Sequence, residues 1–184
     1  MRFKLVPLLL LLTACRVMLP ATGAHPVMVF DDGEHMGLLM LTDDFPLEFH
    51  TQSGLATPLE QPKFVEIGFS ERQWITGQDR SLAHLLRLMV VDGEGVIVIR
   101  YHQSDTGPVF GDTVSRMALT EDQIERLTKE LLLWMELGGT VDVDPRGNPR
   151  YLVRSTQPYS LLTNNCRDFA QEMSRVVTHT GSGD

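Results

Sequence analysis

The chain of 184 residues has few cysteines, only Cys15 and Cys166, and fewer basic than acidic residues, 16 against 24. The resulting net charge of -8 argues against a basic surface for nucleic acid or anionic lipid headgroups. Its histidines and cysteines lack the close paired spacing of a metal site, and no glycine-rich nucleotide loop occurs. The sequence therefore predicts no metal, no cofactor and no nucleic-acid partner.

The amino-terminal segment has the features of an export signal. Arg2 and Lys4 precede an apolar run over residues 5–12 that is too short to span a bilayer. This run leads into Leu12-Thr13-Ala14-Cys15, which resembles the bacterial lipobox, whose cysteine becomes the lipid-modified first residue of the mature protein. The resemblance implies a signal peptide over residues 1–14 and a membrane anchor at Cys15.

We therefore expect a lipoprotein of the cell envelope, held on the periplasmic side of a membrane by Cys15 and a tether over residues 15–26. Ordinary cleavage after Thr22-Gly23-Ala24 is the alternative, and it would give a soluble secreted protein. The remaining chain, about 165 residues, suits one domain, expected over residues 27–178 with a flexible tail over residues 179–184.

Hydrophobic periodicity predicts the secondary structure. Strands are expected over residues 27–30, 36–41, 64–69, 95–101, 113–119 and 151–153. A helix is expected over residues 81–89, where Leu82, Leu85, Leu86 and Met89 recur at helical spacing. A second helix should begin at a capping box at Thr120 and stop at Gly138-Gly139, and a third is expected over residues 166–177. Strands followed by a terminal helix predict an α+β fold around a mostly antiparallel sheet.

Cys166 is the first candidate for chemistry because it stands where the last helix is expected to begin. Backbone N–H groups and the helix dipole at such a start lower the pKa of a thiol. If Cys15 is lipidated or removed with the signal, Cys166 has no disulfide partner in this chain, which is a liability in an oxidising compartment. The alternative is a small, buried and inert thiol.

A thiol nucleophile needs a base, which is usually histidine. Among the six histidines, His35 enters the apolar strand 36–41, and Gly37 beside it leaves room for another group to approach. A polar residue that merely ends a strand is the alternative. The other five lie in the tether, the tail, a helix or positions with no sign of chemistry: His25, His50, His84, His102 and His179.

Three stretches resemble the permuted branch of the papain-like, NlpC-type hydrolases, in which the histidine precedes the cysteine: residues 34–39, 64–72 and 159–170. Their order and separation are also similar to an uncharacterised bacterial domain family within that branch. The Asn-Cys stretch further resembles lecithin retinol acyltransferase-like proteins. The resemblance implies a circularly permuted papain-like fold with the nucleophile, Cys166, at the start of the carboxyl-terminal helix and His35 as the base.

The resemblance also assigns supporting roles. Glu66 matches the position of a polar group that orients the imidazole, and Glu71 is the reserve candidate. Asn165 or Asn164 would help a backbone N–H group to hold the oxyanion, although asparagine is also a common helix cap.

The chain departs from the family pattern beside both reactive residues, where Met36 replaces a small polar residue and Arg167 follows the cysteine. We expect these residues to reshape the pocket and not to abolish chemistry. The predicted activity is attack of Cys166 on an amide or ester bond through a thioester, with cell-wall peptides of peptidoglycan or acyl groups of lipids within reach. The alternative is a catalytically inactive envelope protein that uses the same fold for binding.

Overall fold

The structure is a computed structural model that describes residues 25–31, 35–41, 43, 64–102, 112–143 and 149–178. The strands are β1 His25–Asp31, β2 Met36–Leu41, β3 Phe64–Glu71, β4 Gly95–His102, β5 Asp112–Leu119, β6 Met135–Val143 and β7 Pro149–Ser155. The helices are α1 Arg72–Thr76, α2 Leu82–Leu88, α3 Glu121–Trp134 and α4 Cys166–Thr178. The strands form one sheet in the order β5-β1-β2-β3-β4-β7-β6, and each neighbouring pair is antiparallel. The predicted α+β class with a mostly antiparallel sheet is confirmed.

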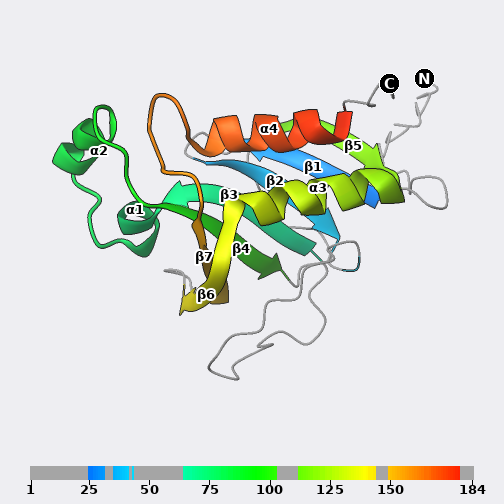
Figure 1. Ribbon diagram of the computed structural model, residues 1–184, viewed down its shortest axis with the longest axis horizontal. Coiled ribbons are helices and arrows are strands. Elements are labelled where there is room, and N and C mark those ends of the chain that lie inside the picture. The colour runs from blue at the N-terminus through cyan, green and yellow to red at the C-terminus, as the bar shows by residue number, and fades with distance from the viewer. Residues whose placement is uncertain are drawn as a thin grey trace, which may run out of the picture.

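Helices α3 and α4 lie side by side and cover one face of the sheet, whereas α1 and α2 lie at one end of it (Figure 1). Because side chains alternate along a strand, Val65, Ile67 and Phe69 of β3 all join the core beneath these helices. The ring of Phe69 packs 5.2 Å from that of Trp134 in α3 and 6.0 Å from that of Phe169 in α4. This aromatic contact fixes the first turn of α4 over β3.

Helix α3 begins as predicted but ends earlier. Thr120 and Gln123 form the expected capping box, and Ile124, Leu127 and Leu131 are buried. The helix stops at Trp134, and the next residues enter β6, where the pairing with β7 shifts register before Gly139. The prediction that Gly138-Gly139 ends the helix is therefore wrong, because Gly138, at φ 94°, belongs to this irregular part of β6.

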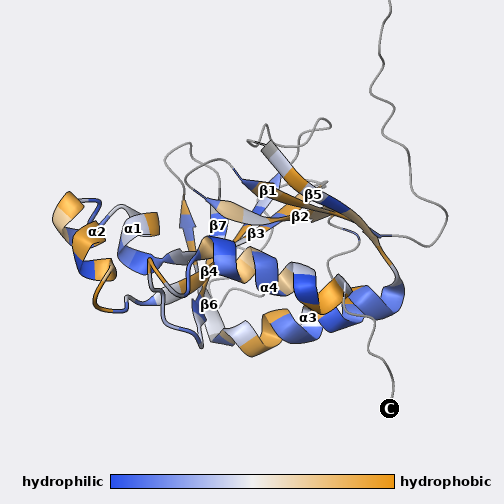
Figure 2. Cartoon of the chain, turned by 90° about the horizontal axis from the view of Figure 1, so that it is seen from above, coloured by the Kyte–Doolittle hydropathy of each residue, from blue (hydrophilic) through white to orange (hydrophobic). Residues whose placement is uncertain are grey.

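The side chain of Ser81 caps helix α2, but the residues at helical spacing do not form a buried face. His84 and Leu88 are its buried residues, whereas Leu82, Leu86 and Met89 are exposed. His84 turns inward because its Nε2 atom lies 3.0 Å from a carboxylate oxygen of Glu71, at the end of β3. Figure 2 shows α2 at one end of the molecule, with much of its ribbon in the colour of hydrophobic residues.

Several predictions fall on segments outside the described residues: Cys15, the signal peptide over residues 1–14, most of the tether and the tail over residues 179–184. His25 and Pro26, which we assigned to the tether, are the first two residues of β1. Within the described ranges, no helix combines the length and the apolar character that crossing a bilayer requires.

Candidate functional site

The start of α4 is fixed by a reciprocal cap. The side-chain oxygen of Asn165 accepts hydrogen bonds from the backbone N–H groups of Arg167, at 2.9 Å, and Asp168, at 3.3 Å. The carboxylate of Asp168 in turn accepts from the backbone N–H of Asn165 at 3.0 Å. The capping role of Asn165 is thus confirmed, and Cys166 is the first residue of the helix.

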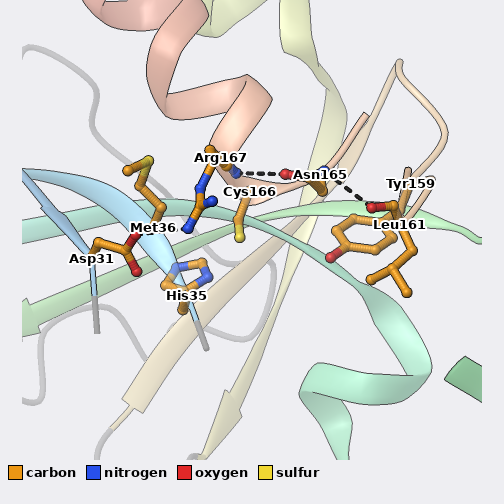
Figure 3. Close-up of a pocket in the computed structure, with 8 residues that line it drawn as sticks. All are labelled: Asp31, His35, Met36, Tyr159, Leu161, Asn165, Cys166 and Arg167. Atoms are coloured by element: carbon orange, nitrogen blue, oxygen red, sulfur yellow. Dashed lines mark hydrogen bonds and ion pairs between the residues drawn. The ribbon is translucent and has the colours of Figure 1, made fainter. Parts of the chain in front are cut away.

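Cys166 and His35 line one pocket of about 250 Å³ between the start of α4 and the adjoining ends of β1 and β2. Figure 3 shows the sulfur atom and the imidazole ring both directed into this pocket, although they come from opposite ends of the domain sequence. Among the described residues, the lining is formed by Asp31, His35, Met36, Tyr159, Leu161, Asn165, Cys166 and Arg167. The pocket thus brings together the predicted nucleophile, the predicted base and one predicted oxyanion residue.

The thiol of Cys166 is half-buried, and this burial raises its pKa. Backbone N–H groups of Met36, Arg167 and Cys166 itself, together with the charge of Arg167, lower the pKa but do not offset the burial. Our expectation that the helix start lowers the pKa of this thiol below its ordinary value is therefore wrong in its net direction. The thiol is mostly protonated at neutral pH and needs a base to become a nucleophile.

The position of His35 depends on a glycine in β3. A Cβ atom on Gly68 would lie 2.2 Å from His35 Nε2 and 2.6 Å from His35 Cε1, so any larger residue would displace the ring. Gly68 pairs with Gly37 of β2, two residues after His35. The imidazole is consequently seated on the backbone of β3, beside the strand position that carries Glu66.

Glu66 is 3% exposed, and its carboxylate accepts hydrogen bonds from the Arg100 guanidinium and from His102 Nε2, the latter at 2.9 Å. Burial raises the pKa of Glu66, but the His102 hydrogen bond and the charges of Arg100, His35 and His102 outweigh it, so the net pKa is lowered. Glu66 therefore remains a carboxylate and attracts a protonated His35. Glu66 does not line the pocket.

Two other predicted residues are engaged elsewhere. The carboxylate of Glu71 caps α1 by accepting from the backbone N–H of Trp74 at 2.8 Å and also contacts His84. Asn164 donates from its side chain to the carbonyl oxygen of Pro158 at 2.5 Å. Neither Glu71 nor Asn164 lines the pocket, so the structure leaves the reserve role of Glu71 and the oxyanion role of Asn164 without geometric support.

Three further residues line the pocket although no sequence pattern pointed to them. Asp31, at the end of β1, accepts a 2.9 Å hydrogen bond from the guanidinium of Arg167. Tyr159 and Leu161 belong to the segment between β7 and α4, where Tyr159 bridges to Gly93. Burial, and then the charge of Cys166, raise the pKa of Tyr159, so its hydroxyl stays protonated in the pocket. Asp31 is far from Tyr159 and Leu161 in the sequence, so only the folded structure shows that they meet at the pocket.

Over the described part of the chain, no three side chains of the metal-ligating types converge to hold an ion. Comparison of the chain with family models, curated proteins and solved structures found no match. The assignment of a function therefore depends on the chemistry of the pocket itself.

Proposed function

We propose that this protein is a cysteine hydrolase or acyltransferase that acts on an amide or ester bond through a thioester on Cys166. One observation carries the proposal: the sulfur of Cys166 and the imidazole of His35 are directed into the same pocket. A thiol and a base within one cavity are the minimum requirement of nucleophilic catalysis by cysteine.

The raised pKa of Cys166 determines how the reaction begins. His35 removes the thiol proton as the sulfur attacks the carbonyl carbon, so that a C–S bond forms and the carbonyl oxygen becomes negative. The imidazolium then gives its proton to the leaving amine or alcohol as the scissile bond breaks. Water, or an acceptor alcohol or amine, attacks the thioester, returns a proton through His35 and frees the thiol.

Donors for the oxyanion are available at the start of α4. The backbone N–H of Cys166 lies close to the thiol, and the protonated hydroxyl of Tyr159 faces the same pocket. Asn165 supports this arrangement by capping the helix and by donating from Nδ2 to the carbonyl oxygen of Leu161 at 3.2 Å. Each well-placed donor stabilises the transition state by about 3 kcal/mol.

The electrostatic partner of His35 in this proposal is Glu66. Because Arg100 and His102 hold Glu66 as a carboxylate, its charge favours the imidazolium that forms during attack. A histidine directly before the early strand β2 and a cysteine at the start of the late helix α4, both on an antiparallel sheet, support the permuted papain-like fold. Because residues 12–15 resemble a lipobox, the proposed enzyme would act at the envelope membrane, with cell-wall peptides or lipid acyl groups as substrates.

A binding protein without catalysis is the second candidate, and the raised pKa of Cys166 favours it. The two candidates differ in whether His35 activates the thiol. Alkylation of Cys166 by iodoacetamide measures this activation without a known substrate.

The test compares wild type with His35→Ala at pH 7 and at pH 10. If the protein is a cysteine hydrolase or acyltransferase, His35→Ala should slow the alkylation of Cys166 at pH 7 by at least about tenfold, because removal of the thiol proton by a base contributes at least that much to the rate. At pH 10 the difference between the two rates should narrow, since a larger fraction of the thiol then ionises without a base. His25→Ala, at the start of β1, is the matched histidine control, and Cys166→Ser gives the background.

A second measurement tests turnover. Incubation with p-nitrophenyl acetate should release p-nitrophenolate and leave an acetyl group on Cys166, detected by intact-protein mass spectrometry and removed by hydroxylamine. Equal alkylation of wild type and His35→Ala at pH 7, with no acetylated Cys166, would establish the binding protein instead.

A further inference from the structure

Arg167 stands directly after the nucleophile and has no part in the mechanism above. Its side chain is 60% exposed, lines the pocket and makes a 2.9 Å ion pair with Asp31 of β1. Figure 3 shows the guanidinium close to the sulfur atom of Cys166, among the residues that line the pocket. Arg167 is therefore placed to meet whatever enters this cavity.

The contacts of Arg167 leave donors for a ligand. A guanidinium carries five N–H groups in a planar fork, and the ion pair with Asp31 is made through Nη2. A carboxylate or phosphate can accept two parallel hydrogen bonds from such a fork. Asp31 keeps the guanidinium at the pocket when no ligand is bound, and an anionic ligand can bind beside this carboxylate or replace it.

The remaining lining is poor in positive charge and partly apolar. Within the part of the chain that the structure describes, His35 and Arg167 are the basic residues that line the pocket, and Met36 and Leu161 supply apolar walls. A pocket of about 250 Å³ holds a group of modest size beside the thiol. An anionic group on the guanidinium would thus lie close to the carbonyl that Cys166 attacks.

We propose that Arg167 determines specificity by binding an anionic group, a carboxylate or a phosphate, that the substrate carries close to its scissile bond. This inference rests on the proposed function of Cys166 and names the class of substrate for that site.

Charge-selective alkylation of the purified protein tests the proposal. Iodoacetate and iodoacetamide both transfer a carbon to the Cys166 sulfur with loss of iodide, but only iodoacetate carries a carboxylate. The ratio of their rates is independent of the thiolate fraction and reports the preference of the site for an anion. We expect this ratio at pH 8 to exceed by about fivefold that of the same protein unfolded in urea, because one nearby positive charge contributes such a factor.

Two substitutions should move the ratio in opposite directions. Arg167→Gln should lower it to the unfolded value, and Asp31→Asn should raise it, because the competing carboxylate is removed. Arg175→Gln is the matched control, since Arg175 lies in the same helix, is 63% exposed and pairs with Glu172 two turns from the pocket. Arg167→Lys keeps the charge but loses the fork, so an intermediate ratio is expected.

Competitors identify the source of the anion. Acetate and inorganic phosphate are added to the iodoacetamide reaction, and the ion that slows it at the lower concentration shows whether the substrate carries a carboxylate or a phosphate. A wild-type ratio equal to that of the unfolded chain, or one that Arg167→Gln leaves unchanged, overturns the proposal. If alkylation at pH 7 depends on His35 but the ratio of the iodoacetate rate to the iodoacetamide rate equals that of the unfolded chain, the proposed catalytic function is retained and only the anionic substrate class is rejected.

Discussion

His35 and Gly68 are neighbours that exclude any side chain between them. Nε2 of His35 lies 2.2 Å from the point that a Cβ atom on Gly68 would occupy. The absence of a side chain at residue 68 therefore determines the position of the proposed base. Because Gly68 does not line the pocket, a substitution there can move His35 without changing a lining residue.

Gly68→Ala should displace the His35 ring and thereby lower the alkylation rate of Cys166 at pH 7 as far as His35→Ala does. Gly68 does not have a positive φ, so alanine fits its backbone, and we expect the free energy of unfolding to change by no more than about 1 kcal/mol. Thiol kinetics and urea unfolding of the same preparation measure both effects.

Gly139→Ala in β6 is the matched control, because a Cβ atom there would meet Val153 and not a residue of the pocket. A Gly68→Ala protein that is folded and alkylates at the wild-type rate at pH 7 would show that the seat of His35 on β3 is irrelevant to the thiol.

The sequence predicted those parts of the fold that depend on local patterns. The apolar run of β2 and the asparagine cap of α4 are signals contained within a few residues, and the structure has both where they were expected. Helix α2 shows the limit of this reasoning. Its leucines have helical spacing, yet Leu82 and Leu86 are exposed, whereas His84 turns inward because its partner Glu71 comes from the end of β3.

The same distinction applies to the candidate site. Cys166 and His35 were found from a helix start and a strand start, which are local features. The partners of Glu66 were missed because strand pairing brings them together: Arg100 lies opposite Glu66 in β4, and His102, two residues on, points to the same face. The raised pKa that burial gives the Cys166 thiol was missed for the same reason, since burial is a property of the whole fold.

Glu66→Gln and Glu71→Gln should separate the two candidates for the orienting group. Glu66→Gln removes the charge that favours a protonated His35, and we expect alkylation of Cys166 at pH 7 to slow by about tenfold. Glu71→Gln should weaken the cap of α1 and the contact with His84, yet leave this rate unchanged. Thiol kinetics of the two variants at pH 7, each shown to be folded by circular dichroism, measure the difference. The reverse pattern would assign the role to Glu71.

Glu66 should also make stability depend on pH. Its pKa is lowered in the folded protein, because the hydrogen bond from His102 and the nearby positive charges outweigh the opposing effect of burial. The stabilisation is therefore complete above the ordinary pKa of 4.5 and is lost as the pH falls through the lower folded value. At pH 7, Glu66→Gln should reduce the free energy of unfolding by about 2 kcal/mol.

This deficit should shrink as the pH falls below 4.5, since Glu66 then takes up a proton in the unfolded chain at a higher pH than in the folded protein. Urea unfolding of both proteins at pH 7, 5, 4 and 3 gives the difference directly. A deficit that is constant over this range would mean that the hydrogen bonds, and not the charge of Glu66, stabilise the fold.

The amino terminus of the mature protein decides between the two processing routes. We expect mass spectrometry of the protein from bacterial membranes to show a diacylated or triacylated Cys15 as its first residue. The alternative cleavage after Ala24 would make His25 the terminus, although His25 already belongs to β1 and its Nε2 lies 3.0 Å from Glu121. Cys15→Ala should move the protein from the membrane fraction to the soluble fraction, because the acyl chains supply the anchor. Cys166→Ala, which changes the other cysteine, should leave it in the membrane fraction, and an unmodified terminus at His25 would rule out the lipid anchor.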